Sequence, residues 1–314
     1  MISTRIGYPR NRWNCYGEIG VKSHVNLPSR SSKTIFMALA SLIAAAMMAA
    51  CASSVPSATS AQPSVPSTSS ESPAAINKVP VIHVFVALCD NVNQGIVPVA
   101  PSLGNGDNPT TNLYWGAAFG IKTFFSRSRD WELVSQSSPG TDVMERLIFK
   151  RKHGDVYLIA DAYRGREIQK TTVDFLESAA GRSGEKLTVK TRTGEVDLHT
   201  HGSADLVAYI GHNGLMDFQL PASPSRRDDR QRRAIILACA SKSYFDKPLV
   251  QTGATPLLWT TNLMAPEAYV LSAAIDGWVK KETDEAIRAR AAAAYHKYQN
   301  CGLRAANRLF VTGW

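Results

Sequence analysis

Two side chains capable of covalent catalysis each follow an apolar run. The run "DLVAYIG" leads directly into His212, and "AIILA" leads into Cys239, 27 positions later. A thiol attacks a carbonyl group as the thiolate, and a nearby imidazole either takes the thiol proton or stabilises the negative charge. The two residues therefore predict nucleophilic catalysis, provided that the fold brings the ends of the two runs together.

Acyl transfer also needs hydrogen-bond donors for the oxyanion that forms in the transition state. Backbone N–H groups at the two turns are the candidate donors, namely those of Asn213 or Gly214 and that of Cys239. Gly211 and Gly214 allow a sharp turn and a close approach of a substrate backbone. The sequence thus predicts an oxyanion site built from main-chain groups.

The elements that must position these residues are five short, almost entirely apolar runs, typical of strands buried on both faces. They cover residues 81–89, 155–163, 205–211, 234–240 and 255–261. Their alternation with helical patterns predicts a parallel sheet covered on both faces. Ligands of such sheets bind beyond the carboxyl ends of the strands, where His212 and Cys239 would lie if the third and fourth strands are neighbours.

Apolar residues spaced by three and four predict the helices between these strands. The predicted helices cover 112–125, 166–181, 265–278 and 285–299. Thr283 is the expected N-cap of the last one, and Pro266 suits a first helical turn. The segments 131–136 and 145–152 fit either a hairpin or a helix edge.

The segments "VAYIGHNG" and "IILACAS" resemble the His and Cys motifs of the caspase-like (clan CD) cysteine peptidases, which include caspases, legumains, gingipains, separases and CHAT-domain proteases. The layout of residues 80–314 is similar to that superfamily, although only roughly twenty residues match in specific motif. The resemblance implies a caspase-like three-layer α/β sandwich with a mostly parallel central sheet. It also implies an endopeptidase that needs no cofactor and no metal, with Cys239 as nucleophile and His212 as general base or ion-pair partner.

This sequence departs from the family pattern in one position. The family usually has Gly directly after the His, whereas Asn213 stands there. A literal His-Gly pair occurs at His201-Gly202, but it precedes its strand, so we expect it at the opposite edge of the sheet. The resemblance further implies substrate-pocket roles for Asp90 and Asp161, and an acidic Asp90 would favour a basic residue before the scissile bond.

Two other interpretations compete with the peptidase. One is a catalytically inactive domain of the same fold that acts as a binding or scaffold module, since a Cys that ends a buried strand is commonly a small core residue. The other is a zinc site formed by His199, His201 and His212 with Asp205 or Asp217, which would activate water. An exposed polar hairpin is the simpler explanation of His199 and His201.

The N-terminal part has the features of a targeting signal. Arg30 and Lys33 precede a short apolar stretch that ends in small residues before Cys51, which resembles a bacterial lipoprotein signal. Residues 1–50 are therefore expected to be a signal peptide with an N-terminal extension. Residues 51–79, rich in Ser, Pro and Ala, are expected to be a lipidated Cys51 and a disordered tether. The residue after Cys51 is not Asp, which favours the outer membrane of a Gram-negative envelope.

Composition limits the partners of the remaining chain. Residues 1–50 contain six of the 35 Lys and Arg residues and one of the 26 acidic residues, which leaves 29 against 25, or +4. We find no cluster of basic residues with interleaved aromatics, so we expect a peptide or protein substrate and no nucleic acid. Cys89, Cys239 and Cys301 form an odd set in an oxidising compartment, and the sequence leaves all three pairings open, Cys89–Cys301 among them.

Overall fold

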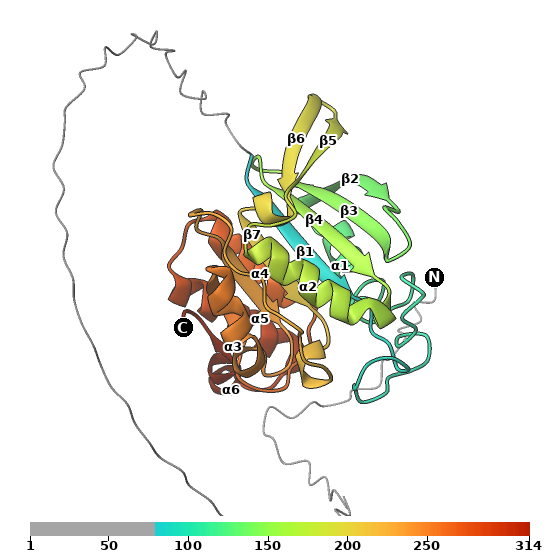
Figure 1. Cartoon of the computed structure of the whole chain (residues 1–314), viewed down its shortest axis with the longest axis vertical. Coiled ribbons are helices and arrows are strands. Elements are labelled where there is room, and N and C mark those ends of the chain that lie inside the picture. Colours follow the sequence, from blue (N-terminus) through green and yellow to red (C-terminus); the bar gives the residue numbers. More distant parts are fainter. Residues whose placement is uncertain (1–78) are drawn as a thin grey trace, which may run out of the picture. The chain divides into compact units, whose positions relative to one another are not determined.

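The computed structural model describes residues 79–314, so the predicted signal peptide, Cys51 and the tether up to residue 78 lie outside the described residues. Eight strands form one sheet in the order β10-β9-β8-β7-β1-β4-β3-β2 (Figure 1). The strands are β1 (Val81–Ala87), β2 (Trp131–Ser137), β3 (Val143–Arg151), β4 (Tyr157–Tyr163), β7 (Leu206–Ile210), β8 (Arg233–Leu237), β9 (Thr255–Thr260) and β10 (Phe310–Val311). A separate two-stranded hairpin consists of β5 (Glu185–Thr191) and β6 (Gly194–Thr200).

The central strands of the large sheet are parallel. β1 pairs in parallel with both β4 and β7, and the parallel pairing continues through β8 to β9. The outer strands β2, β3 and β10 are antiparallel. The predicted α/β class with a large, mostly parallel sheet is therefore confirmed.

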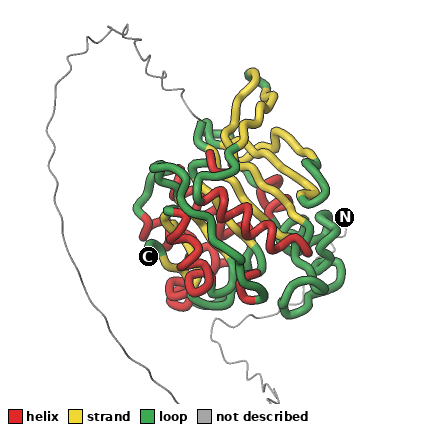
Figure 2. Tube along the Cα trace, viewed as in Figure 1, coloured by secondary structure: helices red, strands yellow, loops and turns green. Residues whose placement is uncertain are grey.

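Two helical layers cover the two faces of the sheet (Figure 2). Side chains alternate along β1, with Val84 on one face and Phe85 on the other. The first face packs against α1 (Ile121–Ser126), α4 (Ala268–Val279), α5 (Asp284–Gln299) and α6 (Leu303–Leu309), and the second against α2 (Ile168–Ala179) and α3 (Ser241–Thr252). Among the described residues, we find no helix with the length and apolar character needed to cross a bilayer.

The predicted helix over 112–125 is wrong except for its last part, because only α1 is helical there. The Asn112 side chain bonds to both the N–H and the carbonyl oxygen of Cys89 (2.9 and 2.8 Å), which holds the preceding segment as a loop. Gly116 also packs so closely on this loop that a Cβ would lie 2.0 Å from the Thr110 carbonyl oxygen. Tertiary contacts therefore override the apolar spacing.

Other local predictions have clear outcomes. The segments 131–137 and 143–151 form the hairpin β2–β3, which extends the sheet. Thr283 is the N-cap of α5, and its hydroxyl accepts a hydrogen bond from the Ala286 N–H (3.3 Å). Pro266 precedes α4 instead of lying in its first turn. His199 belongs to the hairpin β5–β6.

Candidate active site

The sheet brings the two predicted catalytic residues to the same edge. β7 and β8 are parallel neighbours in which Ile210 pairs with Leu237. His212 and Cys239 each follow two residues beyond this pair, so they leave the sheet at the same level. A hydrogen bond joins the two turns, because the side-chain nitrogen Nδ2 of Asn213 donates to the Cys239 carbonyl oxygen (2.7 Å). The adjacency on which the sequence argument depended is therefore present.

The imidazole of His212 is held by a carboxylate. Its Nε2 lies 2.7 Å from Asp217 Oδ2, which also accepts the Gly95 N–H (2.9 Å). The imidazole is mostly buried, whereas Asp217 is partly exposed. A carboxylate at Nε2 favours the tautomer with its proton there, which leaves Nδ1 as the basic nitrogen. Asp217 is thus placed to orient the imidazole.

Cys239 lies in a strained turn between β8 and α3. Ala240, the next residue, has left-handed backbone angles (φ 47°, ψ 35°), which are unfavourable for a residue with a Cβ. The Cys239 sulfur accepts the Met264 N–H (3.4 Å) and lies 3.6 Å from the Met264 carbonyl oxygen. Burial raises the pKa of the thiol, although the Met264 backbone partly offsets this effect. The resting thiol is therefore protonated at neutral pH.

Tyr114 lies between two thiols on the first face of the sheet. A Cβ on Gly211 would make an ordinary contact with the Tyr114 ring (3.5 Å) and a tighter one with the Ala87 carbonyl oxygen (3.3 Å). The hydroxyl group interacts with the Cys89 thiol and is electrostatically coupled to Cys239. Burial raises the pKa of Cys89 to about 12. Cys89, Cys239 and Cys301 are all free thiols, so none of the three possible disulfides is formed.

Among residues 79–314, no hydrogen bond joins the imidazole of His212 to the thiol of Cys239. The thiol contacts the Met264 backbone, and the imidazole contacts Asp217. Catalytic hydrogen bonds in a substrate-free site are often long, and they tighten when substrate binds. Proton transfer here requires a bridging water or a rotation of one side chain.

Asn213, the departure from the family pattern, has a structural role. Its side-chain nitrogen bonds to the Cys239 carbonyl oxygen, and its side-chain oxygen accepts the Leu215 N–H (3.1 Å). Gly214 is buried, and a Cβ there would lie 2.6 Å from the Phe218 ring. These contacts explain the Asn-Gly pair, and the oxyanion role of the backbone at Asn213, Gly214 and Cys239 stays a prediction.

Asp90 is engaged by its own loop. One carboxylate oxygen accepts the N–H groups of Val92 and Asn93 (2.9 and 3.1 Å), and the other accepts the Asn93 side-chain amide (2.8 Å). The carboxylate is 5% exposed. Asp90 thus shapes the loop after β1, and a basic substrate residue would have to compete with these donors.

Asp161 is a fully buried carboxylate and does not line the rim. It lies two residues before the end of β4, where Arg146 contacts both its oxygens (2.7 and 2.8 Å) and His83 Nε2 lies 3.0 Å from Oδ2. Burial alone would raise the pKa of Asp161, but Arg146 and His83 together hold it below its usual range. The predicted pocket role is corrected, since both oxygens are occupied inside the protein.

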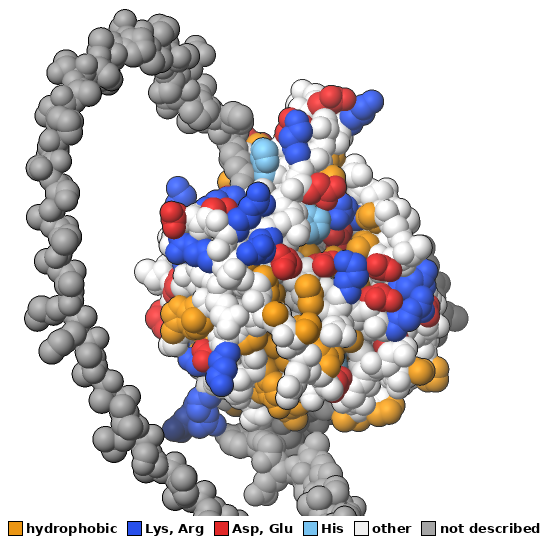
Figure 3. Space-filling view, in the orientation of Figure 1, with side chains coloured by type: hydrophobic (Ala, Val, Ile, Leu, Met, Phe, Trp, Pro, Cys, Tyr) orange, Lys and Arg blue, Asp and Glu red, His pale blue; other side chains and the backbone are white. Residues whose placement is uncertain are grey.

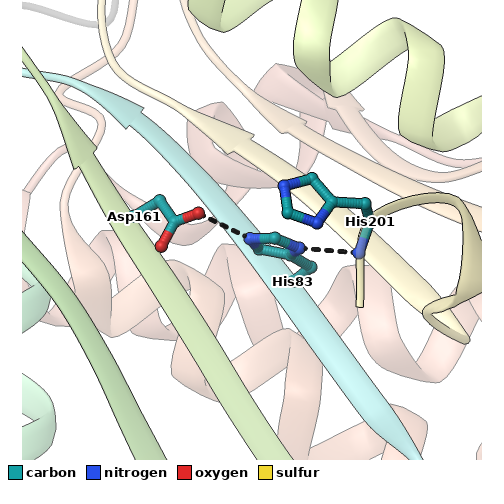
Figure 4. Close-up of side chains that lie close together, drawn as sticks. All are labelled: His83, Asp161 and His201. Carbon is teal, nitrogen blue, oxygen red and sulfur yellow. Dashed lines mark hydrogen bonds and ion pairs between the residues drawn. The ribbon is translucent and has the colours of Figure 1, made fainter. Parts of the chain in front are cut away.

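Within the described part of the chain, His83, Asp161 and His201 form a group of possible metal ligands whose ligand atoms all lie within 4.8 Å of one another (Figure 4). His83 uses both ring nitrogens, because Nδ1 accepts the His201 N–H (2.9 Å) and Nε2 donates to Asp161. A metal ion would have to displace these bonds beside the Arg146 guanidinium, so the arrangement fits a structural network better than a metal site. The zinc alternative is not supported, because His201 lies with His83 instead of with His212.

His201 connects the hairpin β5–β6 to this network. It has a positive φ of 52°. Burial and the neighbouring His83 lower its pKa to about 3, even though the partly exposed Glu185 carboxylate lies 3.4 Å from Nδ1. The imidazole is therefore neutral at neutral pH.

Sequence reasoning did not identify Met264 or Tyr114, and it considered Asp217 only as a zinc ligand. Asp217 had a detectable signal, because it is an acidic residue five positions after a candidate catalytic His. Met264 contributes backbone groups, which any residue type supplies. No family model matches the chain, and the searches of curated proteins and of solved structures return no significant match.

Proposed function

We propose that residues 79–314 form a caspase-like cysteine endopeptidase in which Cys239 is the nucleophile, His212 the general base and Asp217 a positioning residue. The observation that carries this proposal is the level pairing of β7 and β8, which delivers His212 and Cys239 to one edge of the sheet. The strained backbone at Ala240 gives further support, because strain of this kind clusters at functional turns.

The raised pKa of the thiol favours one of the two expected roles of His212. A preformed thiolate–imidazolium pair needs a low thiol pKa, whereas burial raises that of Cys239. In the proposed reaction, His212 Nδ1 takes the thiol proton as the sulfur attacks the carbonyl carbon. The imidazolium then protonates the leaving amine, and water hydrolyses the resulting thioester with His212 again as base.

The surroundings of the site favour apolar substrate residues. Exposed large hydrophobic side chains are concentrated in the loops at the carboxyl edge, where Met216 precedes Asp217 and Leu263 precedes Met264. Val97 lies two residues from Gly95, whose N–H contacts Asp217. We therefore infer a polypeptide substrate with apolar residues beside the scissile bond, instead of the basic residue first expected from Asp90.

Activity-based labelling tests the nucleophile. A panel of peptide acyloxymethyl ketones with apolar and basic residues at the reactive position is expected to label the wild-type chain, the apolar members fastest. Cys239→Ala abolishes labelling, whereas the matched variant Cys301→Ala retains it. Labelling that persists in Cys239→Ala, or wild-type protein that no member labels, would contradict the proposal.

Kinetics on a peptide that the labelling panel identifies test the base. His212→Ala is expected to lower kcat/KM by about 10²–10⁴, the usual contribution of general acid–base catalysis. Asp217→Asn should lower it less, and Asp217→Glu should restore part of the loss if the carboxylate positions the imidazole. An unchanged rate in His212→Ala would exclude its role as base.

A non-catalytic binding module remains the second candidate, and the half-buried thiol without a hydrogen bond to His212 favours it. It predicts that peptides with apolar residues bind equally well to the wild-type and Cys239→Ala chains and that neither chain cleaves them. Isothermal titration calorimetry together with mass spectrometry of the peptide separates the two candidates.

We further propose that the chain is an envelope lipoprotein anchored through Cys51, with the outer membrane as its location. The support is the sequence pattern of residues 30–51. Metabolic labelling with palmitate in a Gram-negative host should mark the wild-type chain and not Cys51→Ser. Equal incorporation in both chains would refute the anchor.

A further inference from the structure

The edge of the sheet opposite the candidate active site is the amino edge. β1 begins there at Val81, directly after the first described residues. Each helix that follows a parallel strand runs back toward this edge, so α2, α3 and α4 end there. The Arg227 N–H donates to the Ala180 carbonyl oxygen (2.9 Å), which places the loop before β8 at the same edge.

The amino edge carries an excess of free positive charge. Six of its exposed basic side chains make no ion pair within residues 79–314. They are Arg127, Arg129, Lys152, Arg227, Lys280 and Lys281. Of the acidic side chains there, Asp130 and, on the hairpin β5–β6, Glu195 lack an ion pair among the described residues, whereas Asp155, Asp205 and Asp228 are all paired. In Figure 3, Lys and Arg side chains lie at the upper left of the visible face among Asp and Glu side chains, and others lie at its right side.

We propose that the amino edge docks on the surface of a lipid bilayer that contains anionic headgroups. Exposed Lys and Arg side chains are attracted to anionic phospholipids by about 1 kcal/mol each. The chain leaves the domain at this edge toward Cys51, only 28 positions before Val79, so the expected anchor would keep the bilayer within reach. Docking would turn His212 and Cys239, at the carboxyl edge, away from the membrane.

Helix dipoles offer a competing explanation of some of these charges. Lys280 and Lys281 follow the end of α4, and Arg127 follows α1, where cations stabilise the negative helix end. That explanation predicts lower helix stability when the lysines are neutralised. It does not predict that anionic vesicles slow the hydrogen exchange of the amino edge more than neutral vesicles do.

Hydrogen–deuterium exchange of the full chain separates these explanations. The chain is mixed with vesicles of pure phosphatidylcholine or with vesicles in which one third of the lipid is phosphatidylglycerol. We expect slower exchange in the loops around residues 127–130, 152–155, 226–230 and 280–283, only with phosphatidylglycerol, and loss of this protection in concentrated salt. Lys280→Gln/Lys281→Gln removes two of the positive charges and should raise the vesicle concentration needed for half-maximal protection by about thirtyfold. The matched pair Lys297→Gln/Arg304→Gln, at the other edge, should leave it unchanged.

Several results would overturn the docking proposal. They are protection that is equal in the two vesicle types, protection centred on residues 92–119 at the carboxyl edge, or an equal shift in the two double variants. Thermal unfolding of each variant shows whether a change reflects lost stability instead of lost docking. None of these readouts involves catalysis, so the docking proposal and the peptidase proposal can fail separately.

Discussion

Substituting Arg146 tests the interpretation of the buried network as structural. Arg146→Met keeps an unbranched, though shorter, apolar stem but removes both hydrogen bonds to Asp161, whose carboxylate is fully buried. Asp161 then retains only the bond from His83 (3.0 Å). We expect a large loss of stability, because the remaining carboxylate is a buried charge without its counter-ion.

The size of the loss follows from the burial. Removing one partner of a buried ion pair typically costs about 3–5 kcal/mol in the free energy of unfolding. For a domain of this size, each kcal/mol corresponds to about 2–4 °C in the midpoint of thermal unfolding, so Tm should fall by roughly 6–20 °C. Asp161→Asn in the same background removes the unpaired charge, and the double variant should therefore be more stable than Arg146→Met alone.

Urea unfolding of the four chains of this double-mutant cycle measures the coupling. The pH dependence gives a second readout, because the lowered pKa of Asp161 means that its contribution is present above about pH 4 and is lost as the pH falls below that value. This dependence should weaken in Arg146→Met. Additive effects within about 0.5 kcal/mol would refute the coupling. A rise in Tm on adding Zn²⁺ to the wild-type chain would instead favour a metal site.

Three further outcomes follow from the described contacts. Iodoacetamide should modify Cys301 first, Cys239 second and Cys89 last, because burial raises the pKa of Cys239 and takes that of Cys89 to about 12. The rate at Cys239 should still rise above pH 9. Peptide mass spectrometry measures the three rates, and equal rates would contradict this order. The free energy of unfolding should fall as the pH is lowered from about 6.5 toward 3, because burial lowers the pKa of His201 to about 3 and only the unfolded chain binds a proton at this imidazole in that range. His201→Asn keeps a residue that tolerates the positive φ and removes the titrating group. In urea titrations this variant should show a weaker dependence of stability on pH. Gly211→Ala should cost about 1–3 kcal/mol in thermal unfolding because φ is 144°, and a neutral result would show that the turn can rearrange.

Much of the fold could be predicted because buried parallel strands have a strong local signature. The runs at 81–89 and 234–240 are apolar at almost every position; β1 lies within the first, and β8 overlaps the second but begins one residue earlier, at Arg233. The order of the strands is a different kind of information. Nothing in the sequence of β1 specifies that it lies between β4 and β7, and this placement is what separates the two edges of the sheet.

The site could be predicted only where its residues are close to a strand end. His212 and Cys239 follow their strands directly, so the parallel register places them together. Asp161 also stands near the end of an apolar run, yet its side chain points into the core, where Arg146 from the antiparallel strand β3 meets it. The apolar run itself carries no signal for a partner on the neighbouring strand, which is why a rim position and a buried ion pair looked alike in the sequence.

The same topology governs both proposals about this protein. Parallel strands with returning helices send the strand-to-helix turns to the carboxyl edge and the ends of the helices that follow them, here α2, α3 and α4, to the amino edge. Cys239 lies in such a turn, whereas β1 begins at Val81 on the amino edge, so the thiol and the start of β1 lie at opposite edges of the sheet. Basic side chains at helix ends and apolar side chains in the long loops then make the two edges chemically different. If the amino edge docks on the bilayer as proposed, the candidate active site would stay open to substrates in solution, because the bilayer and the site would then contact different edges of the sheet.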